Sequence, residues 1–230
     1  MSTFRYWQTA RAGNMARLTL HTGMLPTLAN NHVRIKVHAV GLNFADIFAL
    51  TGLYSATPQG AFIPGLEFAG EVEEVSPEAE RFAVGDRVMG VTRFGGYTSV
   101  IDSEPEYLIP LPADWDYAQG AAWPAQTLTA WYALTHLGAL QADQQVLIHS
   151  AAGGVGLQAM KLVQALGGRA TGTVGSEEKA TWLGQQGFED VLVRAPDFAR
   201  QLQEDERQFD LVLDAICLLY TSDAADEEDS

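Results

Sequence analysis

Cysteine is nearly absent from this 230-residue sequence, which contains only Cys217. One cysteine excludes an internal disulfide and a cysteine-rich zinc lobe. Long hydrophobic runs are also missing. No stretch of about 18 apolar residues predicts a membrane span, and the first residues lack the apolar core of a signal peptide. These absences favour a cytoplasmic protein, although a lone cysteine fits any compartment.

Positive charge is scarce. The chain has 14 Lys and Arg against 29 Asp and Glu, a formal net charge of −15. A negative field repels phosphate backbones, so we expect no nucleic-acid partner. A phosphorylated cofactor is not excluded, because local donors hold it. A hydrophobic fraction of 47% supports packed cores, and the length suffices for two domains.

Short strands separated by glycine turns are expected in the first half of the chain. Residues 33–40 alternate apolar and polar side chains, as in a half-buried strand. Asn43 is placed to cap a short helix over 44–50, which Gly52 ends. Further strands are expected over 67–75, 87–91 and 97–101. This pattern is typical of a small irregular β-barrel.

Strands and helices alternate in the second half. Residues 114–137 are predicted to be helical, with a break at Pro124. Strands are then predicted over 145–149, 170–174, 190–193 and 209–214, and helices between them over 155–166, 177–186 and 198–203. Such alternation predicts a parallel sheet with right-handed crossovers.

A glycine-rich turn joins the first of these strands to the helix that follows. Its spacing, Ala151-x-Gly153-x-x-Gly156, fits the dinucleotide-binding fingerprint with alanine in the first place. Gly153 is expected to let the backbone approach a pyrophosphate, and Gly156 to let the helix pack on the sheet. The alternative is a turn that only reverses the chain. The predicted phosphate-binding residues are Ala152, Gly153, Gly154, Val155 and Gly156.

The residues after the second strand of this region favour NADP(H) over NAD(H). A carboxylate there would bind the ribose 2′-hydroxyl of NAD, but the sequence has Gly175 and Ser176. Ser176 can donate a hydrogen bond, Lys179 supplies a cation, and Arg194 follows the third strand. The alternatives are that Lys179 is a surface lysine paired with the neighbouring glutamates and that Arg194 has no cofactor role.

Several separate motifs occur in one order along the chain. They are Val40 to Asp46, Pro64 to Gly70, Val84 to Val88, Thr129 to Tyr132, His149 to Gly156 and Gly172 to Lys179. Together they resemble the zinc-independent quinone oxidoreductase branch of the medium-chain dehydrogenase/reductase superfamily. The resemblance implies a GroES-like irregular β-barrel domain over 1–124, followed by a partial Rossmann NADP-binding domain, a doubly wound parallel sheet, over 125–216. It also implies homodimers for full-length relatives.

Zinc-dependent relatives carry a Cys near the position of Asn43 and a His at that of Leu66. Neither residue here offers the nitrogen or sulfur ligand that zinc prefers, so we expect no metal. The resemblance implies that Asn43, Thr129 and Tyr132 line the nicotinamide end of the cleft, with Tyr54 on its wall. Alternatively, Asn43 is only a helix cap, and Thr129 and Tyr132 are helix-core residues.

The resemblance implies hydride transfer from NADPH to a quinone or an α,β-unsaturated carbonyl, with Asn43, Tyr54 and Tyr132 as the catalytic candidates. Glu67 and His149 are interpreted as structural. The alternative functions are an enoyl reductase of the polyketide-synthase type, a non-catalytic NADPH-binding protein and an inactive fragment. No sequence feature selects the substrate.

The last residues depart from the family pattern. Residues 217–230 have no strand or helix period and end in an acidic run. We interpret them as a non-native acidic tail on a truncated gene, and the alternative is a natural acidic tail on a short protein. A Rossmann sheet of strand order 3-2-1-4-5-6 cut near residue 216 would leave its fourth strand at an exposed edge. Such a chain is expected to bind the adenosine half of NADP(H) weakly and to turn over slowly or not at all.

Overall fold

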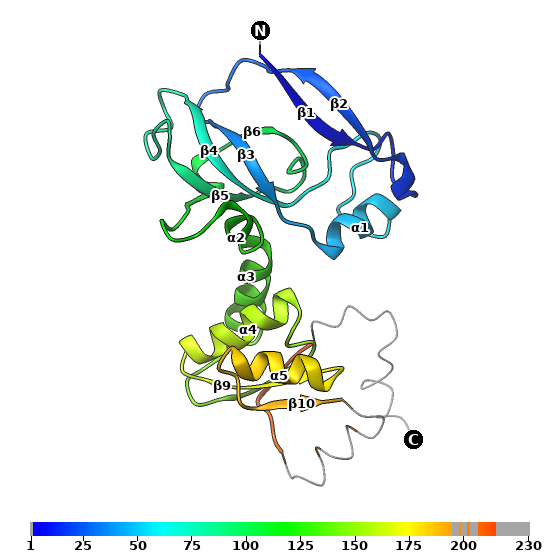
Figure 1. Cartoon of the computed structure of the whole chain (residues 1–230), viewed down its shortest axis with the longest axis vertical. Helices are drawn as coiled ribbons and strands as arrows, with labels where there is room; N and C mark the ends of the chain where they lie inside the picture. The colour runs from blue at the N-terminus through cyan, green and yellow to red at the C-terminus, as the bar shows by residue number, and fades with distance from the viewer. Residues whose placement is uncertain (1, 195–197, 199–201, 203–206, 215–230) are drawn as a thin grey trace. The chain divides into compact units, whose positions relative to one another are not determined.

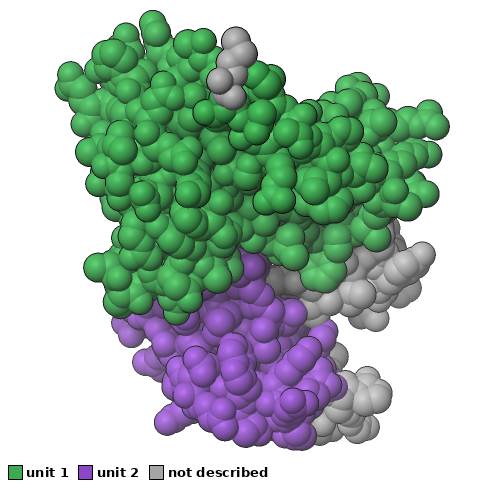
Figure 2. All heavy atoms as spheres, turned by 45° about the horizontal axis from the view of Figure 1, so that its top comes forward, with its two compact units in different colours: residues 1–125 green, residues 126–230 purple. Residues whose placement is uncertain are grey.

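The computed structural model describes residues 2–194, 198, 202 and 207–214. The chain divides into two compact units, residues 1–125 and 126–230 (Figure 2). Each unit has its own sheet and its own hydrophobic core. The helix predicted over 198–203 and the tail over 217–230 fall largely or wholly outside the described residues.

The first unit is built on antiparallel strands (Figure 1). A five-stranded sheet has the order β6-β3-β4-β5-β7, and β1 pairs with β2 in a separate ribbon. Two short helices and two single 3₁₀ turns complete the unit. The bounds are β1 Thr3–Gln8, η1 Met15–Arg17, β2 Thr19–Met24, β3 Val33–Val40, α1 Phe44–Thr51, β4 Glu67–Val75, β5 Arg87–Val91, β6 Val100–Ser103, η2 Pro105–Tyr107, β7 Leu108–Pro110 and α2 Tyr117–Ala121.

The alternating pattern of 33–40 gives the strand that was predicted, because its apolar side chains pack into the core. Strands 67–75 and 87–91 are confirmed, and Gly52 ends α1 in the left-handed conformation (φ 83°). The strand predicted over 97–101 is wrong at its start. Residues 97–99 instead hydrogen-bond to β1, so β6 begins at Val100. The core side chains include Val33, Ile35, Phe68, Val72, Val88 and Leu108.

The second unit has a four-stranded parallel sheet of order β10-β9-β8-β11, as alternation of strands and helices predicted. Helix α4 packs on β8 and β9, and α5 packs on β9 and β10 (Figure 1). The bounds are α3 Pro124–Trp131, the π-helix η3 Tyr132–Leu137, β8 Gln145–Ile148, α4 Gly154–Ala165, β9 Arg169–Val174, α5 Glu177–Gln185, β10 Val191–Val193 and β11 Leu211–Leu213. In chain order the sheet is therefore 3-2-1-4.

Strand β11 lies at the edge of this sheet. It pairs with β8 on one side, and no described strand pairs with its other side. Val212 at its centre is 59% exposed. Strand β11 is therefore the last strand on this side of the sheet among the residues that the structure describes. The hydrophobic core of this unit includes Leu134, Val146, Ile148, Met160, Val163 and Leu183.

Candidate functional site

The turn between β8 and α4 is tightly folded. Ser150 adopts a left-handed conformation (φ 54°), which is uncommon for a residue with a side chain. Its carbonyl accepts a 2.8 Å hydrogen bond from the N–H of Gly153, which caps α4. Ala151 is fully buried, and its N–H donates to the carbonyl of Thr173 in β9. The turn is therefore anchored to both of the strands beside it.

Glycine is required at the last position of the motif by contact with backbone. A Cβ added to Gly156 would lie 2.3 Å from the Ser150 carbonyl oxygen and 2.8 Å from the Cα of Ala151. At Gly153 the nearest atom would be 3.1 Å away, again the Ser150 oxygen. The first turn of α4 therefore packs directly on the backbone of Ser150 and Ala151. Close packing of this kind is the role expected of the third glycine in a dinucleotide fingerprint.

The first turn of α4 presents free donors. The N–H groups of Gly154, Val155 and Gly156 have no hydrogen-bond partner among the described residues. The Gly153 cap supplies no side-chain oxygen to them. Unpartnered N–H groups and the positive end of the helix dipole favour a bound anion. The residues present thus fit the pyrophosphate of a dinucleotide, with Ala152 completing the turn.

The ends of β9 and β10 bring Ser176 close to Arg194. Arg194 follows β10, and its backbone N–H donates to the carbonyl of Val174, two residues before Ser176. The Nε of Arg194 is buried and has no partner among the described residues. Ser176 caps α5, where its Oγ accepts from the N–H of Lys179 at 3.4 Å. The Nε of Arg194 therefore lacks the acceptor that a buried guanidinium nitrogen normally has, among the residues that the structure describes.

Lys179 is exposed, and in the described part of the chain it forms no ion pair with Glu177 or Glu178.

His149 lies at the end of β8, where its Nδ1 is 2.9 Å from the Thr173 hydroxyl oxygen. Burial lowers the pKa of its imidazole. A neutral ring paired with a neighbouring strand agrees with the structural interpretation of His149.

Asn43 and Glu67 meet inside the first unit. Asn43 is the N-cap residue of α1, and its Nδ2 donates to Oε1 of Glu67 at 2.8 Å. The other oxygen of Glu67 accepts a 2.8 Å hydrogen bond from the N–H of Ala125 in the first turn of α3. Glu67 has no exposed surface, whereas Asn43 is half-buried. Asn43 therefore combines its place at the start of α1 with a hydrogen bond to a buried carboxylate.

A second buried carboxylate, that of Asp46, lies in the same cluster. Its Oδ2 accepts hydrogen bonds from the backbone N–H of Asn43 at 2.9 Å and from the Tyr97 hydroxyl at 3.0 Å. Its Oδ1 accepts from the N–H of Gly65 at 3.1 Å. Burial raises the pKa values of Asp46, Glu67 and Tyr97, and for Glu67 the charge of Asp46 adds to the effect.

The three other residues predicted to line the cleft are all at the surface. Tyr54 follows the end of α1 in the first unit, and its side chain is partly exposed. Thr129 in α3 and Tyr132 at the start of η3 belong to the second unit, and both are exposed rather than in a helix core. The Tyr132 ring stacks on His136 with centroids 5.2 Å apart. A π-helix often marks a functional position, and here one begins at Tyr132.

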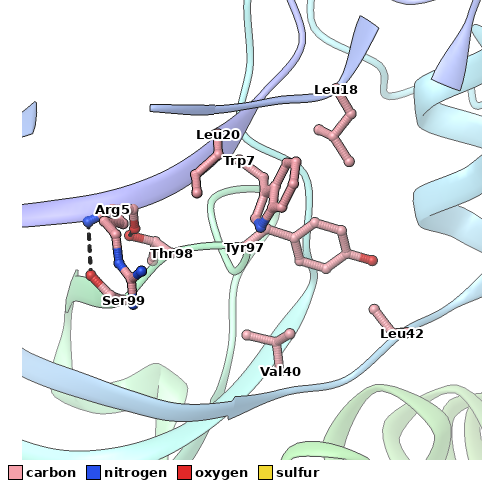
Figure 3. Close-up of a pocket in the computed structure, with 9 residues that line it drawn as sticks. All are labelled: Arg5, Trp7, Leu18, Leu20, Val40, Leu42, Tyr97, Thr98 and Ser99. Carbon is pink, nitrogen blue, oxygen red and sulfur yellow. Dashed lines mark hydrogen bonds between the residues drawn. The ribbon is translucent and has the colours of Figure 1, made fainter. Parts of the chain in front are cut away.

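The first unit also contains an open cavity of about 570 Å³ (Figure 3). Its wall is mainly apolar. The Tyr97 ring lies between Leu18 and Val40, and its hydroxyl donates a hydrogen bond to Asp46. The cavity therefore adjoins the carboxylate cluster. Its lining residues are Arg5, Trp7, Leu18, Leu20, Val40, Leu42, Tyr97, Thr98 and Ser99.

Sequence reasoning did not identify Asp46 or Tyr97. Asp46 is the third residue of α1, a position where an acidic side chain commonly reaches back to the N-cap backbone, so this signal was available. Tyr97 lies 51 residues further along the chain and offers no local signal.

Two absences concern the described residues only. No group of three or more His, Cys, Asp or Glu side chains among them is arranged to hold a metal ion. No helix in the same part of the chain is both long enough and apolar enough to cross a membrane.

Comparison with known proteins identifies both units. The profile of the alcohol dehydrogenase GroES-like domain matches residues 29–113. A quinone oxidoreductase of Pseudomonas aeruginosa is 40% identical over 190 residues, which are 80% of this chain and 58% of that protein. The chain spans only 51% of the quinone oxidoreductase of Sus scrofa.

Solved structures share the fold over both units. The CurK enoyl reductase is 30% identical, with a TM-score of 0.81, covering 92% of this chain and 67% of that one. The Escherichia coli quinone oxidoreductase complexed with NADPH is 31% identical, with a TM-score of 0.78, covering 88% of this chain and 62% of that one. The chain belongs to the medium-chain dehydrogenase/reductase superfamily, in its quinone oxidoreductase-like branch, and consists of a GroES-like unit and part of a Rossmann unit.

Proposed function

We propose that this protein is an NADPH-dependent oxidoreductase that transfers hydride to a quinone or an α,β-unsaturated carbonyl. The observation that carries the proposal is the start of α4. There, the N–H groups of Gly154, Val155 and Gly156 have no partner among the described residues, and Gly156 leaves no room for a side chain. Similarity to a quinone oxidoreductase solved with NADPH supports the same cofactor.

The preference for NADPH over NADH is supported by the surroundings of Ser176. No carboxylate stands at Gly175 or Ser176 to repel a 2′-phosphate. The Nε of Arg194 is buried and has no acceptor among the described residues, and the backbone N–H of Arg194 donates to the end of β9. Lys179 adds an exposed cation in the first turn of α5. A guanidinium and an ammonium favour a phosphate dianion over a hydroxyl.

The protein's own side chains would bind and orient the reactants. NADPH supplies the hydride when it is bound, so no residue has to act as a covalent nucleophile. Asn43 would hydrogen-bond to the substrate carbonyl or the nicotinamide ribose, with Thr129 and Tyr132 fixing the ring and its carboxamide. Tyr54 would form part of the wall. Holding two reactants in register accounts for much of the acceleration in such reactions.

An enoyl reductase is the second candidate, favoured by the similarity to the CurK enoyl reductase over 92% of this chain. The two candidates differ in the acceptor. A quinone accepts hydride at a ring carbonyl system, whereas an enoyl thioester accepts it at the β-carbon and a proton at the α-carbon. Both acceptors require the same cofactor and the same positioning residues.

Loss of NADPH absorbance tests the proposal. Phenanthrenequinone and an enoyl thioester are offered separately, with NADH as the alternative donor. Faster oxidation of NADPH with the quinone supports the first candidate, and faster oxidation with the thioester supports the second. NADPH binding without turnover of either acceptor would indicate a non-catalytic protein, and an absence of binding would contradict the proposal.

A further inference from the structure

Glu67 is positioned to hold the amide of Asn43. It has no exposed surface, and both of its carboxylate oxygens are hydrogen-bonded, one to Asn43 Nδ2 and one to the N–H of Ala125. A Cβ added to Gly41 would lie 2.2 Å from Oε1 of Glu67, so the carboxylate packs closely against the backbone of Gly41, just after β3. The side chain is thus confined in one orientation.

Asp46 holds the backbone of the same residue. Its Oδ2 accepts from the N–H of Asn43, and Tyr97 and Gly65 donate to its two oxygens. Neither Asp46 nor Glu67 forms an ion pair with a basic group among the described residues. Five N–H and O–H donors take the place of a cation. Neutral donors fix the orientation of a buried carboxylate, because each hydrogen bond has a preferred distance and angle.

The chemistry of the pair decides how the Asn43 amide is turned. An ionised carboxylate only accepts hydrogen bonds, so the nitrogen end of the amide must face Glu67. The oxygen end must then face away from Glu67. The amide of the half-buried Asn43 therefore keeps one orientation, with its donor nitrogen toward Glu67 and its acceptor oxygen on the opposite side.

We propose that Glu67 and Asp46 are positioning residues for Asn43. Asp46 fixes its backbone at the start of α1, and Glu67 fixes which end of its amide faces the reactants. This inference rests on the proposed function, in which Asn43 contacts the cofactor or the substrate. It assigns to two buried carboxylates a role that acts only through another side chain.

The substitution Glu67→Gln separates orientation from packing, because glutamine has nearly the same shape. Its oxygen can accept from only one of the two donors. If it accepts from Ala125, its own NH₂ faces Asn43, and the asparagine amide must turn over to present its oxygen. The matched control is Glu71→Gln, the same change at an exposed position on the same strand.

Nuclear magnetic resonance reports the orientation without any requirement for activity. The side-chain amide signals of Asn43 are assigned by their loss in Asn43→Ala. They are expected to shift in Glu67→Gln and to stay in place in Glu71→Gln. If Glu67→Gln fails to fold, the wild-type protein is titrated with acid, and the Asn43 amide signals should move as Glu67 gains a proton. Signals that ignore the substitution, or ignore the titration, overturn the proposal.

A double-mutant cycle tests the consequence for the reaction. We expect Glu67→Gln to lower kcat/KM for NADPH about tenfold, the effect of one misdirected hydrogen bond. The same substitution in the Asn43→Ala background should have no further effect, whereas a general structural role would lower the rate equally in both backgrounds. If the wild-type protein oxidises no NADPH, the proposed function fails, and the resonance measurement still decides the role of Glu67.

Discussion

Replacing Gly156 by alanine should disrupt the start of α4. The added Cβ would lie 2.3 Å from the Ser150 carbonyl oxygen, and real Cβ contacts essentially never fall below 3.0 Å. The atoms in the way belong to the backbone of the turn, so no side chain can rotate to make room. The helix must shift away from β8 by several tenths of an ångström or more, against a closely packed core.

Overpacking of this kind costs about 1–3 kcal/mol, and we expect about 3 kcal/mol here because backbone is displaced. The shift should also move the free N–H groups of Gly154 and Val155 off the phosphate positions and abolish NADPH binding. Urea unfolding gives the stability change from the midpoint at constant slope. NADPH binding is followed by fluorescence.

Gly184→Ala is the matched control. Gly184 lies inside α5, and a Cβ there would meet nothing within 4 Å. Alanine should stabilise that helix by about 0.5–1 kcal/mol and leave NADPH binding unchanged. A Gly156→Ala protein as stable as the wild type, with intact NADPH affinity, would refute the packing argument for the turn.

Three other outcomes are expected. Arg194→Leu should weaken NADPH binding about tenfold and leave NADH binding unchanged, while the exposed Arg169→Leu alters neither titration. Burial raises the pKa of Glu67, so the native state holds the Glu67 proton more firmly than the unfolded state does. The wild type should therefore lose stability relative to Glu67→Gln as the pH rises above the ordinary glutamate pKa. A difference in urea midpoints that does not change with pH would contradict this. Val212→Lys should reduce light scattering by concentrated protein, since an edge lysine opposes strand pairing.

Local patterns were enough to predict most of the elements. The alternation in 33–40 and the turn at 150–156 each depend on near neighbours in the chain, and the structure agrees with both. The order of the parallel sheet agrees with the first four strands of the Rossmann order, which was expected from the glycine-rich turn and the family resemblance.

The carboxylate cluster could not be predicted in the same way. Glu67 meets Asn43 across 24 residues of sequence and Ala125 across 58. Such contacts are set by the path of the whole first unit, which no local period encodes. The start of β6 was misplaced for a similar reason, since residues 97–99 satisfy their hydrogen bonds with β1, almost a hundred residues earlier.

We propose that residues 150–156, with Ser176 and Arg194, form an NADP(H) site. A pair of equilibrium titrations of the 230-residue chain with NADPH and NADH, followed by fluorescence, tests this directly. NADPH is expected to bind at least about tenfold more tightly, the difference expected from one charge-assisted contact to the 2′-phosphate. Equal affinity for the two cofactors, or tighter binding of NADH, would contradict it.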